Sequence, residues 1–323
     1  MPKSDELLKD IFSLIKRPKK NLFYRKNDSN DLRLGEVVKS NVSDYHNSKF
    51  VLVGCPQDIG VKRNNGRPGA AKAPDIIRQY FYKLTADENF LKTKLFDLGN
   101  INPAAAGQES LEKTHLLQEK VISRILSDGK KIIVLGGGND ISYPDCKALS
   151  SLKKEILALN FDSHFDVRFN KLRNSGTSYY MLLEQNIIKG KNFWEIGIKS
   201  SNSSVQHKRY LQAKKANILF IQDILNSKIE NKISNILKKN KSKVVFIGFD
   251  MDSVKSSDAP GVSAPGSFGF TSEDAIKIAS LAGKDGRAKI FEISEVNPRF
   301  DVDGRTSRLA ASMIWYFISS SIK

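Results

Sequence analysis

Cysteine is scarce in this chain, and long apolar runs are absent from it. Its only two cysteines, Cys55 and Cys146, lie far apart and form neither a zinc-binding nor a redox pair, as expected in a reducing cytoplasm. No run of about 18 apolar residues exists that could span a bilayer. The N-terminus has no apolar segment after its charges, which argues against a secretory signal peptide. We therefore predict a cytoplasmic protein without a membrane partner.

The sequence also lacks a nucleic-acid-binding signature, although it is strongly basic. Its 52 lysines and arginines against 35 acidic residues give a formal net charge of +17, which first suggests a nucleic-acid partner. The basic residues are, however, mostly scattered lysines, with short clusters at 16–20 and 238–243. No helix-turn-helix, zinc finger or aromatic RNA-binding pattern accompanies them. We predict a solvated lysine-rich surface that attracts anionic substrates, and no nucleic-acid partner.

Short apolar runs alternate with amphipathic stretches along most of the chain. The runs are typical of buried parallel strands and lie at Phe50–Val53, Lys131–Leu135, Ile156–Phe161, Phe193–Ile198, Ile218–Ile221, Val244–Phe249 and Ala288–Ile293. The stretches with helical spacing lie at Ser110–Leu126, Ser272–Ala282 and Thr306–Ile318. This alternation predicts an α/β fold with one sheet between two layers of helices. The sequence shows no linker and no internal repeat, so we predict a single domain at 49–323, preceded by an N-terminal basic arm or peripheral helix at 1–48.

Acidic residues follow two of the predicted strands. Asp162, His164 and Asp166 come directly after one strand, and Asp250 and Asp252 come after another. In parallel sheets, ligands bind outside the carboxyl ends of the strands. Alternate positions of an extended chain point to one side, so these side chains are expected to converge there. Four carboxylates brought together repel one another unless a cation binds, and mixed oxygen and nitrogen ligands suit manganese or a similar ion.

Each half of this pattern has an ordinary structural explanation. An aspartate at the end of a strand often caps the turn or helix that follows. Two such motifs, each after a core-like strand, make a purely structural role a poor account of both. The sequence therefore predicts a metal site.

Several ordered motifs resemble those of the ureohydrolase family, which includes arginases, agmatinases and formimidoylglutamases. The matching segments cover the chain from about Val51 to its end and are 54–60 with 64–70, 96–99, 160–166, 249–252 with 259–261 and 265–266, and 292–298. The resemblance implies an arginase-like α/β/α sandwich with a mainly parallel sheet, two manganese ions, and trimeric or hexameric assembly. It also implies that the chain is a hydrolase of carbon–nitrogen bonds in linear amidines.

The resemblance also implies roles for individual residues. Asp162 and Asp250 would bridge the two metals, His164 and Asp252 would complete one site, and Asp166 would serve the other. A water whose pKa two cations lower would attack the C=N carbon of a guanidine or formimino group. Asp166 would accept a hydrogen bond from this water and carry its proton to the leaving nitrogen.

Glu295 lies in the segment whose glutamate grips the amidino group of the substrate in the family. Paired N–H···O bonds would hold that cationic group. The structural alternative for Glu295 is an acidic cap on the turn before Pro298.

One position departs from the family pattern. The glycine-rich turn after Lys131–Leu135 usually ends in a metal-binding histidine, but Asn139 stands here. Its amide oxygen is a weaker, neutral donor, so we predict that this metal site binds weakly or stays empty. The other three histidines offer no obvious substitute, because His46 lies in the arm, His115 on an amphipathic helix and His207 in a polar loop.

A second departure bears on the substrate. Arginases and agmatinases carry a histidine where this chain has Ser175, and in that feature and the Gly136–Gly138 turn the chain is closer to formimidoylglutamase. The expected reaction is hydrolysis of N-formimidoyl-L-glutamate to L-glutamate and formamide in histidine catabolism. Asn64 and Ser175 lie on loops expected at the substrate. An anionic substrate also needs cationic anchors, and Arg168 is the first candidate among Arg63, Arg67, Arg168 and Arg173.

Two other functions remain open at this point. The chain could be another amidinohydrolase, agmatinase- or arginase-like, or a metal-poor, non-catalytic protein on the same fold. Release of formamide would favour formimidoylglutamase, and release of urea from a guanidine would favour another amidinohydrolase.

Overall fold

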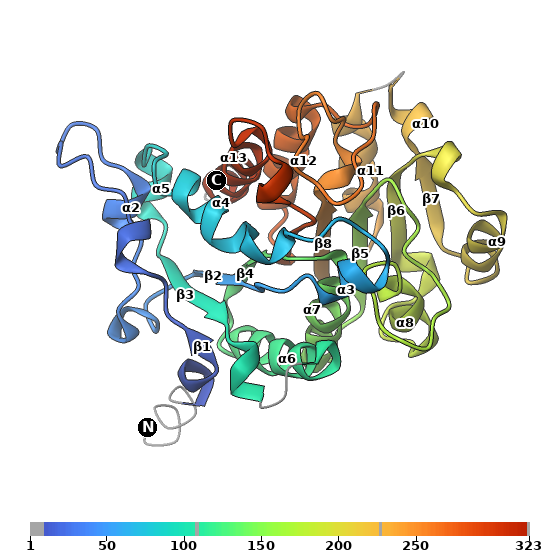
Figure 1. The fold of residues 1–323 in the computed structure, drawn as a ribbon, viewed down its shortest axis with the longest axis horizontal. Coiled ribbons are helices and arrows are strands. Elements are labelled where there is room, and N and C mark those ends of the chain that lie inside the picture. Colours follow the sequence, from blue (N-terminus) through green and yellow to red (C-terminus); the bar gives the residue numbers. More distant parts are fainter. Residues whose placement is uncertain (1–9, 107–109, 226–227, 322–323) are drawn as a thin grey trace.

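A single twisted sheet forms the centre of the molecule (Figure 1). The structure, a computed structural model, describes residues 10–106, 110–225 and 228–321. Over these residues the sheet has the strand order β1-β3-β2-β4-β9-β8-β5-β6-β7, in which only the short edge strand β1 is antiparallel. The strands are β1 Ile15–Lys16, β2 Phe50–Gly54, β3 Leu95–Ile101, β4 Lys131–Leu135, β5 Ile156–Phe161, β6 Phe193–Ile198, β7 Asn217–Phe220, β8 Val244–Asp250 and β9 Ala288–Ser294.

The seven apolar runs all form strands, each within one residue of its predicted bounds. Apart from the edge strand β7, which is only half-buried, these strands are largely buried on both faces, which is why they read as continuous apolar runs. Alternate residues of one strand enter opposite cores: Leu52 of β2 packs into one hydrophobic cluster, and Val51 and Val53 pack into the other.

Helices cover both faces of the sheet, as the sequence predicts (Figure 1). One core is closed by α4 Ala73–Phe81, α11 Ile229–Lys239, α12 Ser272–Lys284 and α13 Arg305–Ser320. The other is closed by α6 Leu111–Ser127, α7 Ser142–Leu149, α8 Ser178–Glu184 and α9 Val205–Ala213. Shorter helices are α2 Leu34–Val37, α3 Ile59–Arg63, α5 Glu88–Lys92 and α10 Ile221–Leu225. The chain is thus the three-layer α/β/α sandwich expected.

The long helices begin at polar caps that the sequence supplies. The hydroxyl of Ser110 accepts a hydrogen bond from the backbone of Lys113 at the start of α6. Thr271 and Asp274 form a reciprocal capping box at the start of α12. Each cap satisfies backbone N–H groups that lack a partner in the first helical turn.

Residues 10–48 pack along the β3 edge of the sheet. Strand β1 pairs with β3, and Ile15 and Tyr45 are buried in the same cluster as the β3 residue Phe96. This contact shields an edge that would otherwise expose unpaired backbone groups. The predicted domain boundary at residue 48 stays a prediction, and residues 1–9 of the predicted arm lie outside the described residues.

A buried ion pair fixes helix α4 to strand β3. Both side chains of the pair, Arg78 and Asp97, are fully buried, and two N–H groups of the guanidinium donate to the carboxylate at 2.8 and 2.9 Å. The guanidinium also donates to Asn100 and to the carbonyl of Gly99, so most of its donors are satisfied. Such bidentate geometry is what a buried charge pair needs to remain stable.

Basic residues gather at the amino-terminal ends of the parallel strands. Each of the eight parallel strands begins within two residues of a lysine or arginine, namely Lys49, Lys94, Lys130, Lys154, Lys191, Lys215, Lys243 and Arg287. Because parallel strands start at one edge of a sheet, these residues gather opposite the carboxyl ends.

No helix in the described part of the chain is long and apolar enough to cross a membrane.

Candidate functional site

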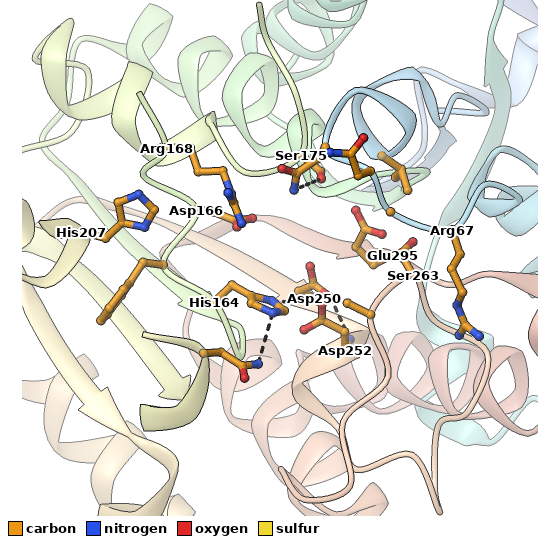
Figure 2. A pocket seen from close by; sticks show the side chains of 17 residues that line it. Arg67, His164, Asp166, Arg168, Ser175, His207, Asp250, Asp252, Ser263 and Glu295 are labelled. Atoms are coloured by element: carbon orange, nitrogen blue, oxygen red, sulfur yellow. Dashed lines mark hydrogen bonds and ion pairs between the residues drawn. The ribbon is translucent and has the colours of Figure 1, made fainter. Parts of the chain in front are cut away.

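The candidate site lies at the carboxyl ends of four neighbouring strands, β4, β9, β8 and β5. Asn139 follows β4, Glu295 follows β9, Asp250 ends β8, and Asp162 follows β5. Segments far apart in the sequence therefore meet at one edge of the sheet. The segments after β5, β8 and β9 line a cavity of about 250 Å³, which Figure 2 shows with its side chains.

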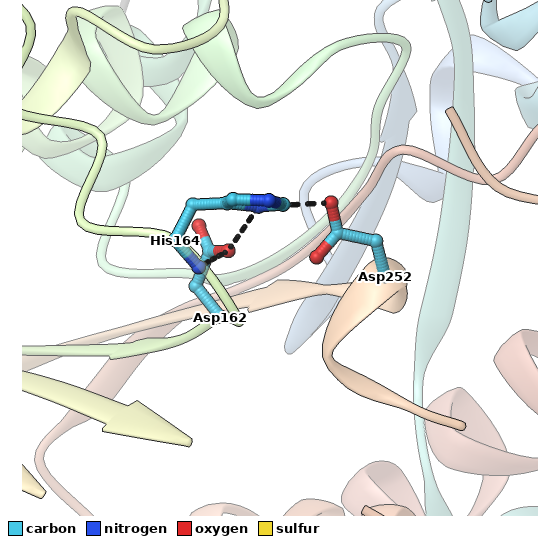
Figure 3. Close-up of side chains that lie close together, drawn as sticks. All are labelled: Asp162, His164 and Asp252. Carbon is cyan, nitrogen blue, oxygen red and sulfur yellow. Dashed lines mark hydrogen bonds and ion pairs between the residues drawn. The ribbon is translucent and has the colours of Figure 1, made fainter. Parts of the chain in front are cut away.

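The first group of potential metal ligands is Asp162, His164 and Asp252, drawn in Figure 3. Their donor atoms all lie within 4.8 Å of one another. Nδ1 of His164 lies 3.5 Å from Asp162 and 3.3 Å from Asp252. Nε2 of the same ring lies 3.3 Å from the Asn202 carboxamide. A partner at Nε2 orients the ring and leaves Nδ1 to face the carboxylates, which is the arrangement of a metal-ligating histidine.

The second group is Asp162, Asp166 and Asp250, whose oxygens meet the same 4.8 Å limit. Asp162 is common to both groups, which suits a carboxylate that bridges two cations. Asp250 falls in the second group alone. Five of the ligand positions predicted from the sequence therefore come together, and four of them, His164, Asp166, Asp250 and Asp252, line the cavity.

The backbone that places these residues differs from the expected extended chain. Asp166 has a left-handed conformation with φ 44°, and Asp252 lies in a 3-10 turn, Met251–Ser253. The predicted alternation along an extended strand is therefore wrong as an explanation, although the residues do converge. The capping role also exists: Asp162 accepts from the backbone of His164, and Asp250 from that of Asp252. These bonds tighten each turn and leave other carboxylate oxygens for the cavity.

The electrostatics of the cluster call for positive charge. Burial, reinforced by neighbouring carboxylates, raises the pKa of Asp166 and of Asp250 well above its ordinary value. The charge of Asp252 raises the pKa of His164 to about 12. Protons thus compensate the clustered charges, and divalent cations would do so more fully with the same oxygen and nitrogen donors. The donor set fits two first-row divalent metal ions.

Asn139 does not present its oxygen to the cluster, contrary to the donor predicted for it. Its amide nitrogen donates to Asp162 at 3.1 Å and to Asp166 at 2.7 Å. Its oxygen instead accepts from the hydroxyls of Ser294 at 2.9 Å and Ser142 at 3.1 Å. The carboxamide thus supplies hydrogen bonds where a histidine would supply a lone pair. This geometry agrees with the prediction of a weak metal site, which remains a prediction.

The glycine-rich turn before Asn139 is required by close packing. A Cβ on Gly137 would lie 1.6 Å from the carbonyl oxygen of Gln57, in the loop after β2. None of the three glycines of this turn has a positive φ. Their role is therefore to let two backbone segments touch, which brings the loop after β2 against the site.

Glu295 enters the cavity from the end of β9 (Figure 2). Its φ of 63° is unusual for a residue with a side chain and marks a strained, functional type of position. One carboxylate oxygen accepts from the backbone N–H of Asn139 at 2.8 Å, and the other is buried with no hydrogen-bond partner among the described residues. Burial raises the pKa of Glu295 to about 8. The nearby hydroxyl of Ser263 acts to lower this pKa, although it is too poorly placed to form a hydrogen bond with the carboxylate.

The predicted substrate-binding residues lie around the same cavity. Asn64 and Ser175 both line it and are joined by a hydrogen bond of 3.0 Å. Arg168 and Arg67 also line it. Arg63 does not line it, because it is paired with Glu112.

The last of the four candidate arginines, Arg173, is also turned away from the cavity, over the ring of Tyr143. Arg67 has a structural contact as well, donating to the carbonyl of Val262 and lying 4.0 Å from the ring of Phe300. Arg168 is therefore the one of the four whose guanidinium has no hydrogen bond or ion pair to residues that the structure describes.

Three polar residues that line the cavity were not predicted from the sequence: Asn202, His207 and Ser263. Asn202 follows β6, and the rule that polar residues after a parallel strand face the ligand could have found it. His207 lies in the first turn of α9, where no local pattern identifies it. His115, by contrast, is buried outside the cavity, 2.8 Å from Asp140, and takes no part in the ligand groups.

Fold and site together define an α/β/α protein with a carboxylate–histidine centre at the carboxyl ends of its central strands. The sequence profile of the arginase family matches residues 48–319, and the chain belongs to this family. The formimidoylglutamase of Rhodococcus jostii is 29% identical over 280 residues, which cover 84% of this chain and 86% of that protein.

Two solved structures are similar over nearly their whole length. Trypanosoma cruzi formiminoglutamase with two Mn²⁺ ions has a TM-score of 0.83 and 29% identity, and the match covers 90% of this chain and 98% of that one. The formimidoylglutamase from Bacillus subtilis has a TM-score of 0.81 and 26% identity, with 93% and 97% covered.

Proposed function

We propose that this protein hydrolyses N-formimidoyl-L-glutamate to L-glutamate and formamide, with two manganese ions as cofactors. Membership of the arginase family and similarity to formimidoylglutamases support the reaction class. The observation that carries the proposal is the pairing, in one cavity, of two ligand groups with a buried, partly unpartnered carboxylate, Glu295. A metal centre and a grip for a cationic C=N group are what this hydrolysis needs.

Asp162, His164, Asp166, Asp250 and Asp252 are the residues that would hold the cations. Bound divalent cations supply Lewis acidity, which lowers the pKa of a water molecule enough to make it a nucleophile near neutral pH. The two ligand groups share Asp162, so both cations would sit beside the same carboxylate.

Glu295 would bind the protonated formimino group. Glu295 lines the cavity; one of its oxygens has no hydrogen-bond partner among the described residues, while the other is fixed by the Asn139 backbone. A cationic group beside it favours the ionised carboxylate and would lower the raised pKa of Glu295. The charge of the substrate thus replaces the proton that burial otherwise holds on this side chain.

Asp166 would move the proton. It lies at the rim of the second ligand group, receives a hydrogen bond from Asn139, and lines the cavity. From this place it can accept a proton from the attacking water and return it to the α-nitrogen of glutamate as that nitrogen leaves. The hydrogen bond from Asn139 favours the ionised form that must accept the proton.

Arg168 would attract the anionic end of the substrate, and two further residues would contact it: Ser175 of the same loop and Asn64 of the loop after β2. The protein would work in the cytoplasm, where its two buried thiols, Cys55 and Cys146, remain reduced. Assembly as a trimer or hexamer stays a prediction of the family resemblance.

The test is formamide release from N-formimidoyl-L-glutamate by the metal-stripped protein, with and without added Mn²⁺. Turnover is expected only with metal, and Asp250→Asn is expected to abolish it. Asp303→Asn makes the same chemical change at an exposed position and should leave turnover intact.

Two results would contradict the proposal. Urea release from a guanidine substrate, without formamide release, would move the chain to another amidinohydrolase activity. Absence of both metal uptake and turnover would make it a non-catalytic member of the family.

A further inference from the structure

Two unpartnered basic side chains stand together at the mouth of the cavity. Arg168 and His207 both line it, and in Figure 2 they lie on the same side, away from Glu295. They come from different elements, the loop after β5 and the first turn of α9. Neither the guanidinium nor the imidazole has a hydrogen bond or ion pair to the part of the chain that the structure describes.

The backbone holds Arg168 in this place. Its N–H donates to the carbonyl of Gly176 at 2.8 Å, which joins the two limbs of the loop. The arginine side chain then runs across Gly176, because a Cβ there would lie 2.6 Å from Cδ of Arg168. A glycine at this position therefore makes room for the arginine stem.

A row of aromatic rings fixes the distance between the two elements. Phe169, the neighbour of Arg168, meets Tyr180 of α8 edge-on at 5.5 Å. Tyr180 in turn lies 5.3 Å from Tyr210, one helical turn after His207 on α9. Tyr210 also donates a hydrogen bond to Glu184 of α8 at 2.9 Å. These contacts tie the arginine loop to the histidine helix through a common neighbour.

The chemistry of the pair selects an anion. Arg168 carries a permanent charge and a planar set of N–H donors that match a carboxylate. Burial, and after it the charge of Arg168, lowers the pKa of His207, so this imidazole is a neutral hydrogen-bonding group near pH 7. The one carboxylate of the cavity wall on the same side, Asp166, makes no ion pair with Arg168 among the described contacts.

We propose that Arg168 and His207 form a carboxylate-binding subsite for the far end of the substrate, the γ-carboxylate of the formimidoylglutamate molecule. This subsite rests on the proposed function, since it places the formimino group at Glu295 and the tail at the cavity mouth. An ammonium tail would meet the arginine charge there, so the pair also rejects substrates that end in an amine.

The first test compares N-formimidoyl-L-glutamate with N-formimidoyl-L-glutamine, in which the γ-carboxylate is an amide. The wild-type protein is expected to prefer the carboxylate in KM, with little difference in kcat. His207→Phe and Arg168→Gln should each reduce this preference about fivefold to tenfold, the effect of one partly solvated charged hydrogen bond. His207→Gln, which keeps a donor, should restore part of it.

The matched control is Lys171→Gln, which removes a positive charge from the same exposed loop but not from the cavity lining. It should leave the preference unchanged, whereas an equal loss in this variant would mean that only general electrostatic attraction is at work. An unaltered preference in both His207→Phe and Arg168→Gln would overturn the subsite while leaving the proposed function in place.

A binding measurement separates the subsite from turnover. L-Glutamate, the product, is added to the wild-type protein while the imidazole proton resonances are followed by NMR, with His207→Phe to assign the signal. A shift of the His207 signal that shrinks in Arg168→Gln supports the subsite even if no substrate is turned over. A His207 signal that does not respond to glutamate overturns it.

Discussion

Replacing Asn139 by histidine is expected to strengthen the weaker of the two metal sites. The amide nitrogen of Asn139 donates to Asp162 and Asp166, so a cation between these carboxylates must displace two charged hydrogen bonds. Each such bond contributes about 1.5–3 kcal/mol. The net loss of one such hydrogen bond on metal binding corresponds to a Kd for the cation that is weaker by about 10- to 150-fold. An imidazole removes this competition and adds a nitrogen ligand.

Equilibrium dialysis against graded Mn²⁺, followed by metal analysis per chain, measures both dissociation constants. The weaker constant should tighten by about 10- to 150-fold in Asn139→His, the range worked out above, while the tighter one changes little. Asn65→His provides the control, because this residue also lines the cavity and its left-handed backbone tolerates histidine.

The reasoning is refuted if Asn139→His leaves both constants unchanged. It is also refuted if Asn65→His tightens binding by the same factor, since the gain would then come from any added imidazole. If Asn139→His strengthens only the metal site that already binds more tightly, Asn139 lies beside that cation and not beside the weaker one.

Three further predictions concern stability and its pH dependence. Asp97→Asn leaves the buried guanidinium of Arg78 with only the more distant carboxylate of Asp75, at 3.8 Å, and should lower the free energy of unfolding in urea by about 3–5 kcal/mol. Gly137→Ala forces a Cβ into a backbone oxygen and should destabilise by about 1–3 kcal/mol in the same assay. Burial raises the pKa of Asp145 to about 7, so the folded protein keeps this carboxyl protonated where the unfolded chain ionises it, and the wild type loses stability as pH rises from about 4 to about 7. Asp145→Asn cannot ionise, so its free energy of unfolding relative to wild type should rise by up to about 4 kcal/mol between pH 4 and pH 8. The measurement is the Tm difference between the two proteins at each pH. Equal Tm differences at both pH values would contradict the last prediction.

The sequence was sufficient for most of the fold because buried parallel strands are long apolar runs. Strand β1 has two residues and leaves no periodic signal. Strand β3 is not among the predicted runs, because Asp97 and Gly99 interrupt its apolar pattern; only its residues 96–99 stood out, as a segment that resembles the family. Both strands depend on partners distant in the sequence: β1 on the edge of β3, and Asp97 on the guanidinium of Arg78.

The sequence indicated which residues would lie close together at this edge of the sheet, but not how their side chains are oriented. The ligand residues follow strands, and strand order brings them together regardless of detailed backbone angles. The left-handed backbone of Asp166 and the rotation of the Asn139 amide depend on tertiary contacts, such as the hydroxyls of Ser142 and Ser294 that hold its oxygen. His207 reaches the cavity only because α9 packs beside α8, a contact that no spacing in the sequence records.

The basic residues at the strand starts give the molecule an electrical polarity. Positive side chains gather at one edge of the sheet and the ligand carboxylates at the opposite edge, while the strands themselves add little net dipole. When the ligand carboxylates are ionised, this arrangement would attract a divalent cation to the cavity and an anion to the opposite edge. Bound cations reverse the local sign at the cavity, so the field favours metal loading before substrate capture. Salt weakens this ordering, because the field fades over about 8 Å at physiological ionic strength.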